Sequence, residues 1–331
     1  MARIIAIGSG MDEAINAASV ILALGRPVAI PTETVYGLAA DATNPAAIAS
    51  IYQTKGRPRF NPLICHMANL EMAEQHADFD PLSRRLAEQF WPGPLTLVLP
   101  LKPESDIHPL ATAGLDSVGI RVPVGFTGHL IRHFGRPLAA PSANSSGRIS
   151  PTTAAHVDDD LGSKIDLVID GGACEVGVES TILKIEDGQI RLLRPGGISV
   201  EAIEAFAGVT VERPKVAGTA IIEAPGMLAS HYAPDTTVRL NATSVAKDEA
   251  LVAFGSTPIS GEADAVMVLN LSPAGDLAEA AANLFDYLKR ADASGAQGIA
   301  VVAIPDHGLG EAINDRLVRA AAPRDAEGNS A

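Results

Sequence analysis

A stretch rich in proline and glycine interrupts this 331-residue chain at positions 211–235, VERPKVAGTAIIEAPGMLASHYAPD. Little hydrophobic periodicity remains there, whereas apolar strand patterns and helical patterns occur on both sides of it. A proline- and glycine-rich stretch without hydrophobic periodicity is typical of a linker between folded units. We therefore predict a first domain at 1–210, a linker at 211–235 and a second domain at 236–322. The polar tail, residues 323–331, is predicted to be disordered.

The two predicted domains differ in how their strands and helices follow one another. The first begins with a helical pattern, DEAINAASVILALG (12–25), and continues with strands, helices and a hairpin-like turn at EDGQ (186–189). This mixture favours a mixed α/β sheet over a regular parallel one. In residues 236–322 apolar strands alternate with helices, which predicts a small three-layer α/β domain.

Composition limits the classes of protein to which the chain can belong. A hydrophobic content of 47% suits a globular protein, and no apolar run approaches the roughly 20 residues of a membrane helix. Asp12 and Glu13 come too early for a signal peptide. Cys65 and Cys174 are the only cysteines, so no disulfide framework is expected. We expect a cytoplasmic protein without a membrane anchor.

Net charge argues against tight, non-specific binding of nucleic acid. The formal charge is −14, and residues 1–210 and 211–331 each carry −7. Stable non-specific binding needs many cationic contacts with phosphates. Any anion site must therefore be local.

A short basic stretch, KGRPRFNPL (55–63), is predicted to be a loop that begins at Lys55, and it is the first candidate for such a site. Pro58 and Pro62 stiffen the backbone around Lys55 and Arg57. Lysine supplies a point charge and arginine a planar fork, and both suit phosphate or carboxylate. The alternative is a solvated turn after a helix.

A second candidate is the polar run APSANSSGRISPT (140–152), which follows the apolar strand pattern PLAA. Its serine and asparagine side chains offer hydrogen-bond donors without bulk. Open α/β sheets bind ligands beyond their strand ends, and small donors suit phosphate. A flexible loop is the alternative.

Arg121 lies on an apolar strand pattern, IRVP (120–123). A buried cation is costly unless an anion meets it. Either a structural carboxylate or the anionic group of a ligand must therefore lie beside Arg121. The segment PTETVYGLAAD (31–41), which includes Glu33, is ambiguous between a turn and a pocket.

Other motifs carry less weight. No P-loop is present, and GSGMDEA (8–14) lacks the third glycine of a dinucleotide-binding motif. His129 and His133 have helical spacing but no acidic partner, which favours an ordinary helix face over a zinc site. We predict no dedicated metal site.

Seven motifs together resemble those of the threonylcarbamoyl-AMP synthases, the YrdC/YwlC family. They are PTETVYGL (31–38), KGRPRFNPL (55–63), WPGPLTLVL (91–99), IRVP (120–123), APSANSSG (140–147), ESTI (179–182) and LRPGG (193–197). The segment PGM…HYAP and the second α/β domain resemble the longer, two-domain form of that family. The fold that the resemblance implies is a twisted, open, mixed α/β sheet followed by a small Rossmann-like, three-layer α/β domain.

The resemblance implies a nucleotidyltransferase reaction. L-Threonine captures bicarbonate as a carbamate, the carbamate attacks the α-phosphate of ATP, and diphosphate leaves. Mg²⁺ is expected to accompany ATP. The product would pass to a tRNA threonylcarbamoyltransferase for t6A formation at position 37.

Site residues carried over by motif fall into two sets. The ATP set comprises Arg57, Asn61, Ser117, Ser142, Asn144, Ser150, Arg194 and Tyr232. The threonine set comprises Thr34, His66, Arg121 and Ser180. The resemblance implies catalytic roles for Lys55 and Arg57, and makes the linker a lid in which Tyr232 closes over the nucleotide.

Two alternative functions belong to other classes. The first is an RNA-binding module, but an acidic chain without an aromatic-basic stripe speaks against it. The second is a carbamoyltransferase that acts on another acceptor. The chain length and the HYAP segment favour the synthase.

Overall fold

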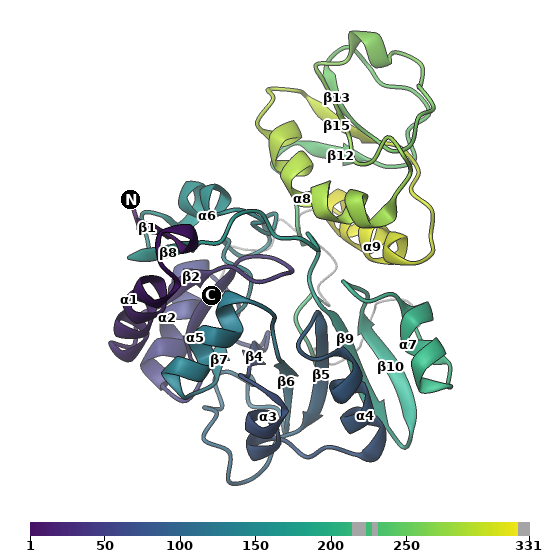
Figure 1. Ribbon diagram of the computed structural model, residues 1–331. Helices are drawn as coiled ribbons and strands as arrows, with labels where there is room; N and C mark the ends of the chain where they lie inside the picture. Colours follow the sequence, from purple (N-terminus) through teal and green to yellow (C-terminus); the bar gives the residue numbers. More distant parts are fainter. Residues whose placement is uncertain (214–222, 227–230, 324–331) are drawn as a thin grey trace. The chain divides into compact units, whose positions relative to one another are not determined.

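The computed structural model describes residues 1–213, 223–226 and 231–323 (Figure 1). The chain divides into two compact units, one built from residues 1–146 and 150–227 and the other from 147–149 and 228–331. The main division between the two units, between residues 227 and 228, lies inside the stretch 211–235 that the sequence predicts to be a linker. The assignment of residues 147–149 to the second unit was not expected from the sequence. The tail 324–331 lies outside the described residues.

The first unit is built on one large mixed sheet (Figure 1). Its strands are β1 (Arg3–Ala6), β2 (Val28–Ile30), β3 (Gly37–Asp41), β4 (Ile64–His66), β5 (Leu95–Pro100), β6 (Ser117–Arg121), β7 (Leu138–Ala139), β8 (Leu167–Asp170), β9 (Thr181–Glu186), β10 (Gln189–Arg194) and β11 (Val211–Glu212). Their order in the sheet is β1-β8-β2-β3-β7-β4-β6-β5-β9-β10-β11. Because β4 pairs parallel to β6 while β5 pairs antiparallel to it, the predicted mixed sheet is confirmed.

Helices connect these strands. They are η1 (Ile7–Ser9), α1 (Met11–Ala23), α2 (Pro45–Lys55), α3 (Leu70–His76), α4 (Pro81–Phe90), α5 (Phe126–Phe134), α6 (Ala154–Leu161) and α7 (Val200–Ala207). The pairing of β11 with β10 means that the first two residues of the predicted linker belong to the sheet.

Helix α2 shows how local sequence places a functional side chain. The side chain of Asn44 accepts hydrogen bonds from the amides of Ala46 and Ala47, and Pro45 occupies the first turn. Gly56 ends the helix in the left-handed region, with φ of 62°. Lys55 is therefore the last residue of a helix, which corrects the prediction that it lies on a loop.

Strand alternation gives the central sheet two different faces. Cys65, Leu97 and Ile120 contribute to the main hydrophobic core on one face. A smaller buried cluster, Ile64, Val98, Ile182, Leu193 and Ala224, lies on the other. In β4, His66 lies two residues after Ile64, and in β6 Arg121 pairs with His66. Both side chains therefore lie on this second face, which we call the polar face.

The second unit contains a four-stranded parallel sheet in the order β12-β15-β13-β14. Its elements are β12 (Thr237–Arg239), β13 (Glu249–Ala253), η2 (Glu262–Asp264), β14 (Met267–Asn270), α8 (Leu277–Asp292), β15 (Gly298–Val301) and α9 (Leu309–Ala321). Helices α8 and α9 pack against each other on this sheet (Figure 1).

In the described part of the chain, connecting segments cover the other face of this sheet. There Ala242 and Val245 pack against Leu251 and Ala300. Strands and helices alternate in this unit, so the predicted α/β domain is confirmed, whereas its three-layer, Rossmann-like detail stays a prediction.

No helix in the described part of the chain combines the length and the apolar content needed to cross a bilayer.

Candidate functional site

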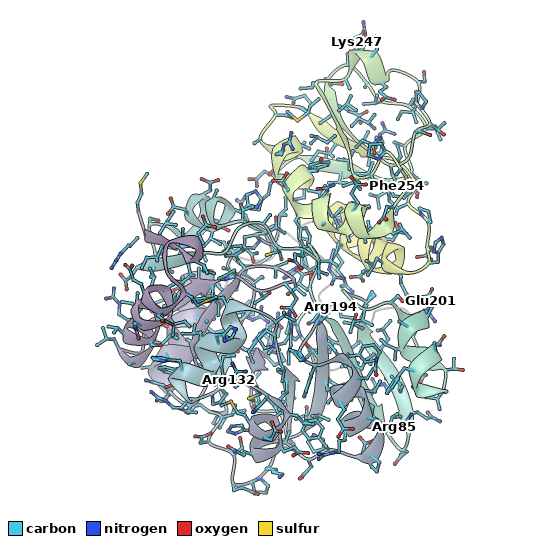
Figure 2. All side chains as sticks on the ribbon, in the orientation of Figure 1. Arg85, Arg132, Arg194, Glu201, Lys247 and Phe254 are labelled. Carbon is cyan, nitrogen blue, oxygen red and sulfur yellow. The ribbon has the colours of Figure 1, made fainter. Side chains whose placement is uncertain are left out.

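Buried cations gather around the polar face of the first unit. Lys55, Arg57, Arg121 and Arg194 are each at most 8% exposed. Figure 2 labels Arg194 at the end of β10, whereas Arg85 and Arg132 lie exposed on helices α4 and α5. Buried charges are costly unless partners compensate them, so their partners define the site.

Lys55 reaches from the end of α2 to the loop that follows β7. Its Nζ donates to the backbone carbonyls of Ser142 (2.5 Å) and Asn144. Among the described residues no carboxylate forms an ion pair with Lys55. Burial, followed by the nearby Arg57 guanidinium, lowers the pKa of Lys55 well below its usual value. Two of the three N–H donors are used, and the third remains for an anion.

Arg57 is held by the backbone of its own segment. Its Nε donates to the carbonyl of Asn61 (3.1 Å) and one terminal nitrogen donates to that of Pro62 (2.8 Å). The Oδ1 atom of Asn61 is buried without a hydrogen-bond partner. Ser117 begins β6 two residues before Gly119, which pairs with Ile64, so Ser117 lies at the sheet level of Pro62. The structure thus places Asn61 and Ser117 near the starts of the neighbouring strands β4 and β6, with Arg57 held in the segment that leads into β4.

Arg121 meets a structural carboxylate. One terminal nitrogen lies 2.8 Å from Glu33 Oε1, and the other donates to Thr34 Oγ1 at 2.8 Å. Its Nε donates to the carbonyl of Gly93 at 3.3 Å. Glu33 Oε2 in turn accepts from the amide of Val124 at 3.3 Å. Of the two possible partners for Arg121, the structure contains the carboxylate.

His66 lies directly opposite Arg121 in the parallel register of β4 and β6. Its Nδ1 is buried without a hydrogen-bond partner. Burial and the Arg121 charge lower the pKa of His66 to about 3, so the ring is neutral at physiological pH. A neutral imidazole with an unpaired nitrogen can accept or donate one hydrogen bond to a ligand.

Arg194 and Ser180 meet because of a β-bulge. The pairing of β10 with β9 shifts between Leu192 and Arg194, so Arg194 stands opposite Ile182 on the polar face. The guanidinium donates to the Ser180 carbonyl (2.9 Å) and Oγ (3.2 Å). Ser180 Oγ also lies 2.8 Å from Thr96 Oγ1.

A glycine permits the close approach of the Arg194 turn to Ser180. A Cβ atom on Gly196 would lie 2.3 Å from the carbonyl oxygen of Glu179. Any side chain at position 196 would therefore push the turn away from the segment 179–181, which includes Ser180.

The loop after β7 borders the start of β3. Ser142 forms a bridge with Gly37, and the amide of Tyr36 donates to the carbonyl of Pro151 (2.9 Å). Ser150 Oγ donates to Glu179 Oε1 at 2.6 Å. Contacts therefore link the loop after β7, to which Lys55 donates, with the segment before β3 that includes Thr34 and with the segment that includes Ser180.

Tyr232 occupies a different position from the other predicted residues. Its ring is 1% exposed, stacks on Phe285 at 5.5 Å and lies 5.1 Å from the Arg316 guanidinium. All three residues belong to the second unit. Most of the predicted lid, residues 214–222 and 227–230, lies outside the described residues, and the role of Tyr232 over a nucleotide stays a prediction.

Three residues of the polar face were absent from the predicted site sets. Glu33 pairs with Arg121, Glu179 accepts from Ser150, and Thr96 contacts Ser180. For Glu33, the only indication in the sequence was that it lies inside the motif PTETVYGL. Glu179 and Thr96 also lie inside quoted motifs, but no spacing rule connects them with their distant partners.

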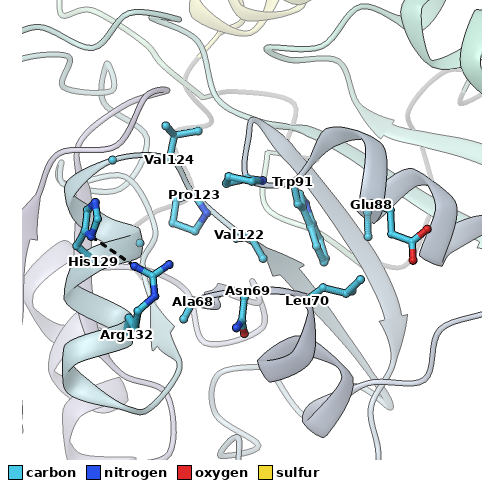
Figure 3. Close-up of a pocket in the computed structure, with 14 residues that line it drawn as sticks. Ala68, Asn69, Leu70, Glu88, Trp91, Val122, Pro123, Val124, His129 and Arg132 are labelled. Carbon is cyan, nitrogen blue, oxygen red and sulfur yellow. Dashed lines mark hydrogen bonds between the residues drawn. The ribbon is translucent and has the colours of Figure 1, made fainter.

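A separate pocket of about 350 Å³ lies beside α5 (Figure 3). Its walls include Trp91, Val122, Pro123, His129 and Arg132, and His129 Nδ1 lies 3.4 Å from the Arg132 guanidinium. None of the predicted site residues lines it. Among the described residues, no cluster of three or more histidine, cysteine, aspartate or glutamate side chains could hold a metal ion.

The arrangement on the polar face combines two kinds of binding element. Lys55, Arg57 and Arg194, together with small hydroxyl and amide groups, suit a polyanion. Arg121 beside Glu33 presents a cation and an anion 2.8 Å apart. Such a pair suits a small zwitterion.

Comparisons with known proteins agree with this geometry. The family model Sua5/YciO/YrdC, described as "Telomere recombination", matches residues 20–196, and the model "Threonylcarbamoyl-AMP synthase, C-terminal domain" matches residues 198–322. The threonylcarbamoyl-AMP synthase of Bacillus subtilis is 39% identical over 95% of this chain and 94% of its own length. That of Pyrococcus abyssi is 41% identical over 91% and 92%. The crystal structure of P. abyssi Sua5 complexed with L-threonine has a TM-score of 0.85 and 35% identity, and covers 97% of both chains.

Proposed function

This chain belongs to the Sua5/YciO/YrdC family of threonylcarbamoyl-AMP synthases, and we propose that it converts L-threonine, bicarbonate and ATP into threonylcarbamoyl-AMP, diphosphate and water. The four buried cations around the polar face carry the proposal. A globular chain with net charge −14 keeps them out of water, which suits a bound polyanion.

ATP is assigned to the region of Lys55, Arg57 and Arg194. Lys55 and Arg57 face the phosphates, where they offset the charge that develops as diphosphate leaves. Asn61, Ser117, Ser142, Asn144 and Ser150 complete this side, as the sequence motifs predict. Mg²⁺ enters as part of the MgATP substrate, because phosphates and water supply most of its ligands.

Threonine is assigned to the region of Arg121. The guanidinium has five N–H donors, and hydrogen bonds to Gly93 and Thr34 use two of them. The remaining donors can bind the substrate carboxylate. Ser180, His66 and Thr34 lie on hydrogen-bonded or paired segments around Arg121 and would recognise the rest of the amino acid.

The reaction is a nucleotidyl transfer. The free amine of threonine combines with bicarbonate to give a carbamate and water. A carbamate oxygen then attacks the α-phosphorus of ATP, and the bond to the β-phosphate oxygen breaks. Holding the two anions close together is most of the catalytic task.

The product is a mixed anhydride that water cleaves readily. We therefore propose that it passes to a tRNA threonylcarbamoyltransferase, which makes t6A at position 37. This enzyme itself needs no stable contact with nucleic acid.

The full-length protein tests the proposal directly. It is incubated with MgATP, ¹³C-bicarbonate and each amino acid in turn, and diphosphate release and adduct mass are recorded. We expect both products with threonine and neither without bicarbonate. A parallel incubation replaces MgATP and bicarbonate by carbamoyl phosphate. Carbamoyl transfer in that incubation, without an adenylate adduct in the first, would support the carbamoyltransferase alternative and contradict this one.

A further inference from the structure

Glu33 is a buried carboxylate to which the proposed reaction has so far assigned no task. Its side chain is 9% exposed and lies 2.8 Å from Arg121. Oε2 accepts from the amide of Val124, but Oε1 is buried without a hydrogen-bond partner. The approach to Arg121 is an ion pair without hydrogen-bond alignment, so Oε1 retains its capacity to accept a proton donor.

The proposed reaction needs an acceptor of this kind. At neutral pH the amino group of threonine is an ammonium, whose nitrogen has no free electron pair. One proton must leave before the nitrogen can form a bond with the carbon of bicarbonate. The amine and bicarbonate then give carbamate and water, so one proton is released overall.

Other titratable groups around the polar face suit this task less well. His66 has a pKa of about 3 and does not hold a proton at neutral pH. Glu179 already accepts from Ser150 Oγ, and Asp160 accepts from both the amide and the hydroxyl of Ser145. Burial, with a further contribution from Glu33, raises the pKa of Cys174 to about 12, which keeps this thiol neutral. Among these carboxylates, Glu33 is the one that lies within ion-pair distance of Arg121.

The spacing of the pair also fits an α-amino acid. In such a molecule one carbon separates the carboxylate from the ammonium, so its two charges need adjacent partners of opposite sign. Arg121 and Glu33 provide them in a place where each is nearly buried. We propose that Glu33 binds the α-ammonium group of the amino-acid substrate and accepts its proton, while Arg121 holds the carboxylate.

This inference rests on the proposed function, and its test separates the two. Wild-type protein must first release diphosphate with threonine, bicarbonate and MgATP. If the wild-type protein releases no diphosphate, this result contradicts the proposed function, and it does not test the role of Glu33. The informative variant is Glu33→Gln in the full-length chain, which keeps the shape and removes the proton acceptor.

Initial rates are measured from pH 6.5 to 9.5 and expressed relative to wild type. At pH 7 we expect kcat/KM for threonine to fall about 100-fold, as is typical when a general base is lost. The deficit should shrink as pH rises, because the free amine then forms without help. Calorimetric affinity for MgATP should stay unchanged.

Glu33→Asp is the matched control, since it shortens the side chain but keeps the carboxylate. Its rate should be lower than wild type with the same pH dependence. A deficit of Glu33→Gln that is equal at every pH would overturn the proposal and leave a structural role. If Glu33→Gln does not fold, Glu33→Ala is measured in the same way, and a deficit that is equal at every pH in this variant would overturn the proposal as well.

Discussion

His66 and Arg121 face each other at the ends of the parallel strands β4 and β6, and both side chains are buried. The desolvated imidazole stays neutral because burial and the neighbouring guanidinium lower its pKa to about 3. In the unfolded chain the same group would titrate near 6.5. This difference couples folding to pH.

We therefore expect stability to fall as pH decreases below about 6.5. In that range the unfolded chain binds a proton that folded His66 does not, so protonation favours unfolding by up to about 1.4 kcal/mol per pH unit. In the variant His66→Asn the denaturation midpoint should change less between pH 6.5 and pH 4 than it does in the wild-type protein. His108→Asn, at a partly exposed site, is the control and should show the same change of midpoint with pH as the wild type.

Lys55→Met should reduce diphosphate release about 100-fold while the fold persists. Methionine fills a similar volume, but it cannot supply the preorganised charge that a phosphate needs. Arg59→Met changes an exposed cation four residues away and should leave turnover unchanged. Equal activity of both variants would exclude a phosphate role for Lys55.

Arg121→Met should weaken threonine binding more than MgATP binding. The loss of a charged hydrogen bond is worth about 1.5–3 kcal/mol, which corresponds to roughly 10- to 100-fold in Kd. Calorimetric titration of each ligand gives the two values. Equal losses for both ligands would argue that the variant disturbs the whole site.

The double variant Arg121→Met/Glu33→Gln separates folding from binding. Arg121→Met alone leaves Glu33 buried without its cation, a loss that costs about 3–5 kcal/mol at fully buried pairs. Neutralising Glu33 should restore much of the thermal stability without restoring threonine affinity. Recovery of affinity in the double variant would contradict the assignment of Arg121.

Tyr232 has two possible roles that two substitutions can separate. Tyr232→Ala removes a ring packed on Phe285 and should destabilise the second unit by roughly 3–5 kcal/mol, as other large aromatic truncations do. Tyr232→Phe keeps the ring and removes the hydroxyl. If the hydroxyl also contacts the nucleotide, Tyr232→Phe should weaken MgATP binding without lowering the melting temperature. Unchanged MgATP affinity in that variant would leave only the packing role.

Local sequence was sufficient for several parts of this protein. The cap at Asn44, the stop at Gly56 and the apolar pattern around Arg121 depend on residues a few positions apart. Interactions of that range act within one helix or strand, so their residue patterns are visible in the chain. The linear motifs also brought most candidate site residues to attention, because each motif forms one short segment of the site.

Tertiary structure alone decided which partners these residues meet. Arg121 required an anion, but the choice of Glu33 depends on bringing together segments that are far apart in the sequence. The bulge that turns Arg194 toward Ser180 is a property of strand pairing and not of either strand. Likewise, Tyr232 meets Phe285 only once α8 has packed on its sheet. Sequence determines which charges and caps are available, whereas burial, which makes an unpaired charge costly, arises only when distant segments pack.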